Sequence, residues 1–292
     1  MPVKIRNLVM LMLLVAWPAH AADRTFDLDY GKGEVQTLSV GKATAIYLDK
    51  GSGAPIVLFH PHDDYRNWQR QIPELAKTHR VIALSYRIDE HMFAPPPLAA
   101  TLQALETRLE LGPVTFVGHS FGGLEAILLA AEHPELLRKL VLEEPAADLS
   151  NGTVHCALSD PSEFELSLCN TQSLLAGPGY YEGSSEGFKQ YLQEVQRDNE
   201  KAQAAALESG VLKSTDELLH VPDVCAEAGK ITVPVLFIRG ANTPAALQVG
   251  LDRHEECLPE HERVVLPHAR HWGHLDAPED FNRAVLDFVE RD

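Results

Sequence analysis

A serine inside a Gly-His-Ser-Phe-Gly-Gly run, residues 118–123, constrains this chain more than any other feature. The run follows an apolar, β-branched stretch, 114–117, and opens a helical one. A strand, a sharp turn and a helix with Ser120 at the apex would strain the serine backbone and lift its hydroxyl clear of a sheet. Gly118 and Gly122 suit this turn because a Cβ at either place would collide with neighbouring backbone. The pattern favours an exposed hydroxyl over an ordinary Gly/Ser turn.

Buried strands and helical stretches alternate along most of the chain, which predicts an α/β fold with a mostly parallel sheet covered by helices on both faces. Residues 25–49 alternate in polarity and suit antiparallel strands. The expected buried strands are residues 55–60, 80–85, 114–117, 140–144, 233–238 and 263–266. The expected helices are residues 68–78, 98–111, 124–132, 245–258 and 278–291.

The alternation stops at Pro145 and resumes near residue 231. We therefore expect one core domain, residues 22–145 and 231–292, with a mainly helical lid, 146–230, inserted into it. Aromatic residues of the lid would line a pocket or pack the lid onto the core. They are Phe164, Tyr180, Tyr181, Phe188 and Tyr191.

The first residues resemble a secretory signal peptide. Lys4 and Arg6 precede a short apolar run, 8–17, and an Ala-His-Ala site that ends at Ala21. This predicts cleavage after residue 21 and a secreted, periplasmic protein, with an uncleaved amphipathic anchor as the alternative. No later stretch is long and apolar enough to span a bilayer. The formal net charge of −17 argues against binding to nucleic acid or anionic lipid.

The chain has four cysteines, an even number that behind a signal peptide suggests two disulfides. Of the three possible pairings, Cys156 with Cys169 and Cys225 with Cys257 is favoured, because the first two are close in sequence within one irregular segment. Unpaired buried thiols are the alternative. No C-x-x-C is present, which argues against a thiolate zinc site.

A serine hydroxyl needs an adjacent base to become a nucleophile. His271 is the best candidate because it follows the last expected strand, and loops at the carboxyl ends of parallel strands gather at one edge of the sheet, where Ser120 also lies. His274 and His268 in the same loop are the competitors.

A carboxylate must orient that histidine and stabilise its charged form. The loop at 240–244 contains none, whereas the strand before the lid ends in Glu143 and Glu144. Alternation along a strand should send one glutamate to the active edge and the other away. Glu144 is the preferred acid because it stands directly before Pro145, although two solvated glutamates at a strand end are also compatible with the pattern.

An oxyanion that develops during attack needs two N–H donors. Phe121 supplies one candidate, as the residue after Ser120. The second should come from the loop after the 55–60 strand, and because Pro61 has no N–H, His62 is the expected donor.

Together these residues resemble the α/β-hydrolase family, in particular its lidded esterases, lactonases, haloperoxidase-like enzymes and C–C hydrolases. The resemblance rests on the serine turn, on the His271-Trp-Gly-His-Leu-Asp-Ala-Pro loop and on Leu-Val-Leu-Glu-Glu-Pro at 140–145, which in one branch supplies the acid. It implies a Ser–His–Glu triad. Three departures are Thr243 at the usual position of the acid, Pro61 in the oxyanion loop and Arg270 before the histidine.

The sequence therefore predicts a hydrolase of a small carboxylic ester or lactone that forms an acyl-enzyme at Ser120 and needs no cofactor or metal. Perhydrolysis, C–C bond hydrolysis and a non-catalytic binding role remain alternatives. A metal site is a further alternative, because His60-x-His62-x-Asp64 resembles part of a metallo-hydrolase motif. The oligomeric state and the natural substrate stay open.

Overall fold

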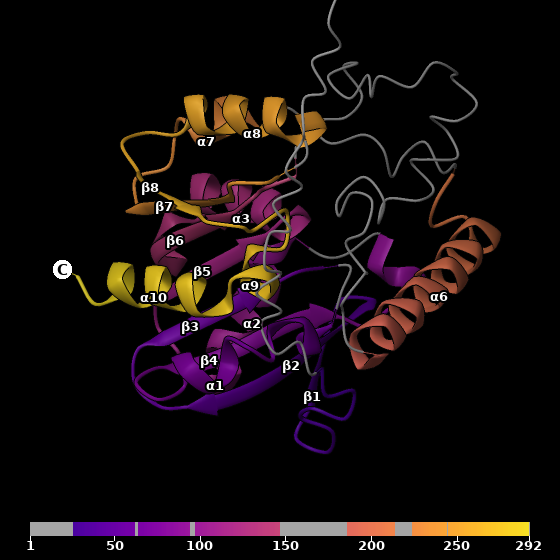
Figure 1. Cartoon of the computed structure of the whole chain (residues 1–292). Helices are drawn as coiled ribbons and strands as arrows, with labels where there is room; N and C mark the ends of the chain where they lie inside the picture. The colour runs from indigo at the N-terminus through magenta and orange to yellow at the C-terminus, as the bar shows by residue number, and fades with distance from the viewer. Residues whose placement is uncertain are drawn as a thin grey trace, which may run out of the picture.

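The computed structural model describes residues 26–61, 64–93, 97–146, 186–213, 224–243 and 245–291. Eight strands in these ranges form one sheet in the order β1-β2-β4-β3-β5-β6-β7-β8 (Figure 1). β2 pairs antiparallel with β1 and β4, and every other neighbouring pair is parallel. The strands are β1 (Gln36–Val40), β2 (Ala43–Gly51), β3 (Pro55–Phe59), β4 (Arg80–Tyr86), β5 (Val114–His119), β6 (Leu137–Glu143), β7 (Val235–Gly240) and β8 (Glu262–Leu266).

The central strands are apolar at successive positions because both faces of the sheet are covered. Val57 and Phe59 of β3 belong to one buried cluster, and Ile56 and Leu58 belong to the cluster on the opposite face. The first face is packed by α2 (Leu98–Leu109), α3 (Phe121–Glu132), α7 (Cys225–Ala228) and α8 (Ala245–Cys257). The second is packed by η1 (Tyr65–Trp68), α1 (Ile72–Leu75) and α10 (Pro278–Val289) (Figure 1). Three further short helices are η2 (Glu90–Phe93), η3 (Pro134–Leu136) and α9 (Gly273–Asp276).

The helix expected at 68–78 is wrong in extent. The chain instead forms the 3₁₀ turn η1 and the single-turn helix α1, separated by residues 69–71. Pro73 lacks an amide hydrogen and so suits the first turn of a new helix, but it cannot continue a preceding one. Trp68, Ile72 and Leu75 nevertheless share the buried face that the helical spacing indicated.

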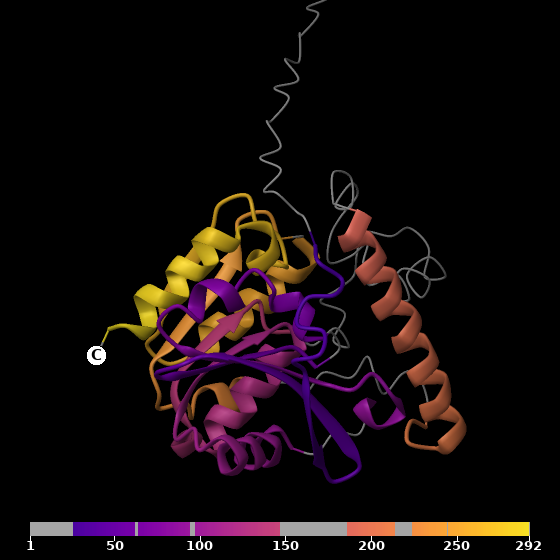
Figure 2. The ribbon, with the colours of Figure 1, turned by 90° about the horizontal axis from the view of Figure 1, so that it is seen from below.

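The long helix α6 (Glu186–Ser209) lies outside the two helical layers, to one side of the sheet (Figures 1 and 2). Its inner face includes Phe188, Tyr191 and Val195, which form a buried cluster with Trp272 of the core. This helix falls within the predicted lid, whose bounds stay a prediction because 147–185 and 214–223 lie outside the described residues. The predicted signal peptide, 1–21, lies outside them too. None of the described helices combines the length and hydropathy that crossing a membrane requires.

Candidate active site

Ser120 lies at the turn between β5 and α3 and is buried. Its φ is 52° and its ψ is −119°, a conformation that a residue with a side chain adopts only under strain. Backbone segments approach closely here. A Cβ on Gly118 would lie 2.4 Å from the carbonyl oxygen of Gly122, and a Cβ on Gly122 would lie 2.5 Å from that of Phe59. The sharp bend that the glycine spacing predicted is therefore present, but the expectation of an exposed serine is wrong, because Ser120 is buried.

Glu144, directly after β6, is fully buried and has a positive φ of 42°. Its carboxylate is surrounded by three donors. Oε1 accepts hydrogen bonds from the Gly240 amide, at 2.8 Å, and from the Thr243 hydroxyl. Oε2 lies 2.9 Å from Nδ1 of His271. Thr243, which stands where the resembled family places its acid, thus donates a hydrogen bond to the glutamate that faces the histidine.

His271 is buried, and its two ring nitrogens have different surroundings. Because a carboxylate only accepts hydrogen bonds, Nδ1 donates its hydrogen to Glu144 and the neutral ring carries its lone pair on Nε2. Nε2 is buried and has no hydrogen-bond partner among the described residues. An imidazole in this tautomer can accept a proton at Nε2.

His119, the residue before Ser120, connects the serine turn to the His271 loop. Its Nε2 lies 3.0 Å from the His271 carbonyl oxygen and donates to it, and the two rings lie 4.8 Å apart. The serine turn and the histidine loop therefore lie at the same edge of the sheet. Burial, and then the neighbouring His274, His271 and His60, hold the pKa of His119 well below its usual value. A neutral His119 avoids placing a second positive charge beside His271.

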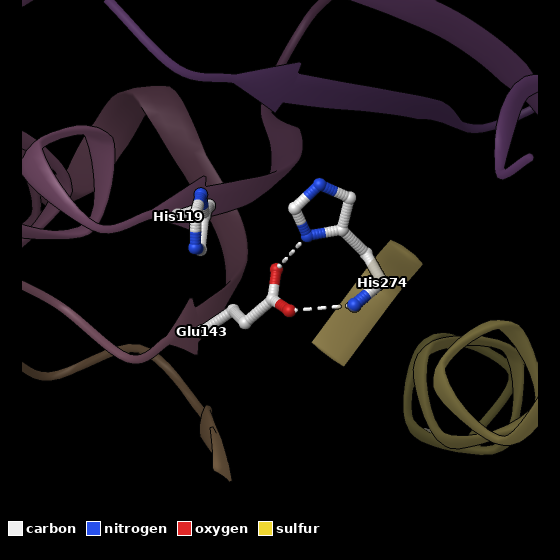
Figure 3. A group of neighbouring side chains, drawn as sticks. All are labelled: His119, Glu143 and His274. Atoms are coloured by element: carbon white, nitrogen blue, oxygen red, sulfur yellow. Dashed lines mark hydrogen bonds and ion pairs between the residues drawn. The ribbon is translucent and has the colours of Figure 1, made fainter. Parts of the chain in front are cut away.

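The two competitors for the role of base are placed differently. His268 is exposed, with a positive φ of 65°. His274 is fully buried and pairs with Glu143: its amide nitrogen and its Nδ1 lie 2.8 Å from Oε1 and Oε2 of that carboxylate, respectively (Figure 3). Of the three histidines, His271 is the one that hydrogen-bonds to Glu144.

The expectation that one glutamate of the pair would point away from this loop is wrong, and so is the alternative that both are solvated. Glu143 and Glu144 are both fully buried, and each hydrogen-bonds to a histidine of the segment after β8. Alternation holds only for an extended backbone, and the left-handed conformation of Glu144 ends it. The Glu143–His274 pair was missed, although Glu-Glu and His-x-x-His are both visible in the sequence.

Of the two expected oxyanion donors, Phe121 belongs to the described part of the chain and His62 does not. Phe121 follows Ser120 as the first residue of α3, where the partial positive charge of a helix N-terminus favours a developing negative charge. His62 lies outside the described residues, as does Asp63. The alternative metal site at His60-x-His62-x-Asp64 is less favourable, because the Asp64 carboxylate already pairs with Arg66. It accepts hydrogen bonds from the Arg66 amide, Nε and Nη2.

A disulfide joins Cys225 at the start of α7 to Cys257 at the end of α8, as predicted, with the two Cα atoms 5.1 Å apart. It ties together two helices of the same layer. Cys156 and Cys169, the other predicted pair, lie outside the described residues.

The helix α6 reaches the loops around the site at two points. Trp272, next to His271, packs in the buried cluster with Phe188 and Tyr191. Arg66, in the 3₁₀ turn η1, lies over the ring of Tyr191 at 5.0 Å and forms an ion pair with Glu194 at 3.3 Å. Burial by itself lowers the pKa of Arg66, but the hydrogen bonds from Arg66 to Asp64 and Glu194 and the negative charge of Asp64 outweigh that effect. The pKa of Arg66 is therefore raised, and its guanidinium stays charged.

Comparison with known proteins gives similar sequences and similar folds. The chain is 23% identical over 269 residues to a 2-hydroxy-6-oxo-6-(2'-aminophenyl)hexa-2,4-dienoic acid hydrolase of Metapseudomonas resinovorans, covering 87% of this chain and 90% of that protein. A hydrolase from Pseudomonas aeruginosa has a similar structure, with a TM-score of 0.66, 20% identity and coverage of 89% and 100% of the two chains. The enol-lactonase of Burkholderia xenovorans gives a TM-score of 0.65, 22% identity and coverage of 88% and 100%.

The family described as "alpha/beta hydrolase fold" matches residues 55–278, which include the serine turn, both glutamates and the histidine loop. This range is more than half of the chain. The observed sheet order and the helices on both faces agree with that match. The chain therefore belongs to the α/β-hydrolase fold family and is a hydrolase.

Proposed function

We propose that this protein is a secreted serine hydrolase that cleaves a carboxylic ester or lactone through an acyl-enzyme. The observation that carries the proposal is the buried hydrogen bond from His271 to Glu144, at the sheet edge where the strained Ser120 also lies. It leaves the lone pair of His271 Nε2 without a protein partner among the described residues.

In the proposed reaction the Ser120 hydroxyl attacks the substrate carbonyl carbon while His271 Nε2 takes its proton. The tetrahedral intermediate then collapses, and His271 returns the proton to the leaving alcohol, so the acyl group stays on Ser120. His271 next deprotonates a water molecule that attacks the acyl-enzyme. The acid leaves, and the proton returns to Ser120. In a lactone the acid and alcohol parts belong to one molecule, and the same steps open the ring.

Glu144 would orient His271 and stabilise its positive charge during both steps. The negative oxygen of the tetrahedral intermediate would accept hydrogen bonds from the Phe121 amide and from His62. The N-terminus of α3 adds a favourable dipole at the same place.

The segment 146–230 would form the lid that selects the substrate. Support comes from α6, which contacts Trp272, next to His271, and Arg66 in η1. The choice of an ester or lactone is supported by the enol-lactonase among the similar folds. Secretion to the periplasm is supported by the pattern of residues 1–21 and by the Cys225–Cys257 disulfide, since such bonds persist in oxidising compartments.

A second candidate is C–C bond hydrolysis of a 2-hydroxy-6-oxo-dienoic acid. The relative from Metapseudomonas resinovorans and another from Paraburkholderia xenovorans, 26% identical over 287 residues, are hydrolases named for such substrates. The same serine and histidine would serve this reaction, with a carbon leaving group in place of an alcohol.

The test is labelling of the purified protein with a fluorophosphonate probe, followed by assays on short and long p-nitrophenyl esters, lactones and a 2-hydroxy-6-oxo-dienoate. We expect labelling and ester or lactone turnover in the wild type, and neither in Ser120→Ala. EDTA should leave the rate unchanged. Absence of labelling in the folded wild type would favour a binding protein, and turnover of the dienoate alone would favour the second candidate.

A further inference from the structure

A second carboxylate–imidazole pair lies directly beside the first, and the mechanism above does not use it. Glu143 and Glu144 are adjacent in sequence. The histidines that they contact, His274 and His271, are three residues apart. All four residues are buried. Two parallel connections thus run between the end of β6 and one short segment after β8.

Glu143 holds His274 through both its backbone amide and its ring. The His274 amide and its Nδ1 each lie 2.8 Å from a different oxygen of Glu143, so each carboxylate oxygen accepts one hydrogen bond from the same residue (Figure 3). Its ring lies 4.4 Å from Trp68 and 4.8 Å from His119, measured between ring centres. A ring confined in this way and bonded at Nδ1 has a single orientation.

The same contacts fix the backbone that carries His271. The His271 carbonyl accepts from His119 Nε2 at 3.0 Å, and the His274 carbonyl accepts from Gln71 Nε2 at 2.7 Å. Between these two carbonyls, Glu143 holds the His274 amide. The segment is therefore anchored to β5, to β6 and to the chain before α1, and the Glu143 contact is the one made by a charged group, which is the stronger type of hydrogen bond.

We propose that Glu143 and His274 form a positioning pair, which holds the His271 segment where His271 Nε2 can take the proton of the Ser120 hydroxyl. The inference rests on the proposed function. Neither residue touches the reacting atoms: the pair acts through the backbone that it fixes. A displacement of the base by about 1 Å can lower a rate by about 100-fold, so such an anchor matters for turnover.

A bound metal is a less suitable explanation of the same side chains. Ligating atoms of His119, Glu143 and His274 do lie within 4.8 Å of one another. However, each Glu143 oxygen already accepts a hydrogen bond from His274, so a hydrogen-bonded pair accounts for the position of both side chains without an ion. Glu143 and His274 are thus a hydrogen-bonded pair in which Nδ1 of the histidine is engaged, while its Nε2 has no hydrogen-bond partner among the described residues.

Three variants and one control test the proposal in the purified full-length protein. His274→Leu removes the ring donor, whereas His274→Asn retains a side-chain N–H near the place of Nδ1. Glu143→Gln removes the charge of the acceptor. The control is His79→Leu, which removes another buried histidine at the amino end of β4, away from the site.

With an ester substrate, we expect His274→Leu and Glu143→Gln to lower kcat by about 10- to 100-fold. KM should change less than about 3-fold. Fluorophosphonate labelling should slow in parallel, and the pH profile of kcat/KM should change. His274→Asn should recover most of the loss, and His79→Leu should keep wild-type kcat. Wild-type kcat and pH profile in His274→Leu, measured well below its melting temperature, would overturn the proposal.

An NMR measurement tests the positioning pair independently of the proposed function. It also replaces the kinetic test if His274→Leu does not fold. In proton NMR spectra, the hydrogen between an imidazole and a carboxylate resonates at low field. The wild type should therefore show one such signal for His271–Glu144 and one for His274–Glu143. His274→Asn should remove one signal and leave that of His271 in place, whereas Glu143→Gln should also displace the His271 signal. An unmoved His271 signal in Glu143→Gln would contradict positioning, whether or not Ser120 is labelled.

Discussion

Nδ1 of His271 lies 2.9 Å from Oε2 of Glu144, although 127 positions separate the two residues in sequence. The glutamate follows β6 and the histidine follows β8, so β7 lies between their strands in the sheet. Gly240, at the end of β7, donates its amide to the other oxygen of the same carboxylate. Three consecutive strand ends thus converge on one buried negative charge.

Glu144→Gln should lower kcat by roughly 10³-fold or more, because the amide keeps the size of the side chain but neither carries the charge that stabilises protonated His271 nor fixes its tautomer. The measurement is steady-state kinetics on a p-nitrophenyl ester, with a melting curve to confirm folding. Ser120→Ala sets the background rate. A Glu144→Gln enzyme with a wild-type rate would assign the acid role to another residue.

Thr243→Val should lower kcat by about tenfold, since it removes one donor from the Glu144 carboxylate, and a hydrogen bond to a charged group contributes about 1.5–3 kcal/mol. Thr243→Ser keeps the hydroxyl and is the matched control, with a rate near that of the wild type. Equal rates in the valine and serine variants would show that the Thr243 hydroxyl has no part in supporting Glu144.

Lys139→Met should reduce the free energy of unfolding by about 1–3 kcal/mol without changing kcat. The buried Lys139 amine donates to the carbonyl of Phe288 in α10, at 2.8 Å, and to that of Arg291, two residues after α10. It lies near the amino end of β6, away from the site. Urea unfolding measures the loss, and Lys230→Met, an exposed ion-pair partner, is the control expected to have little effect. Equal stability of the two variants would contradict this role.

Reduction of the Cys225–Cys257 disulfide should destabilise the protein by about 2–4 kcal/mol, because the bond closes a long loop and limits the unfolded chain. Melting curves with and without dithiothreitol measure the effect. The Cys225→Ser/Cys257→Ser variant should melt at the lower temperature of the reduced protein. Its melting temperature should also respond less to dithiothreitol, and an unchanged wild-type curve would contradict the prediction.

Glu125 should make stability fall as the pH rises. Burial raises the pKa of this half-buried side chain on α3 from 4.5 to about 7. The folded state therefore holds the proton more tightly than the unfolded state, and stability is lost between about pH 4.5 and about pH 7. Glu125→Gln should match the wild-type melting temperature below this window and exceed it above. A difference that stays constant from pH 4 to pH 8 would contradict the assignment.

Local sequence patterns predicted much of the fold. Apolar runs predicted β3, β4 and β5 to within a few residues, and the spacing of Gly118, Ser120 and Gly122 predicted the strained turn. These features depend on sterics and burial within a few residues, so they are readable from sequence. The helix at 68–78 was wrong because Pro73 stands in the first turn of a new helix, α1, and the preceding 3₁₀ turn ends at Trp68.

The sequence by itself determined that Ser120 stands at a sharp bend, that strands alternate with helices, and that a histidine follows the last strand. Only the tertiary structure decided that His271 contacts Glu144 while His274 contacts Glu143, and that Thr243 donates to the acid. The reason is physical: backbone conformation is governed by near neighbours, whereas a hydrogen bond between distant segments depends on how the strand ends are packed together.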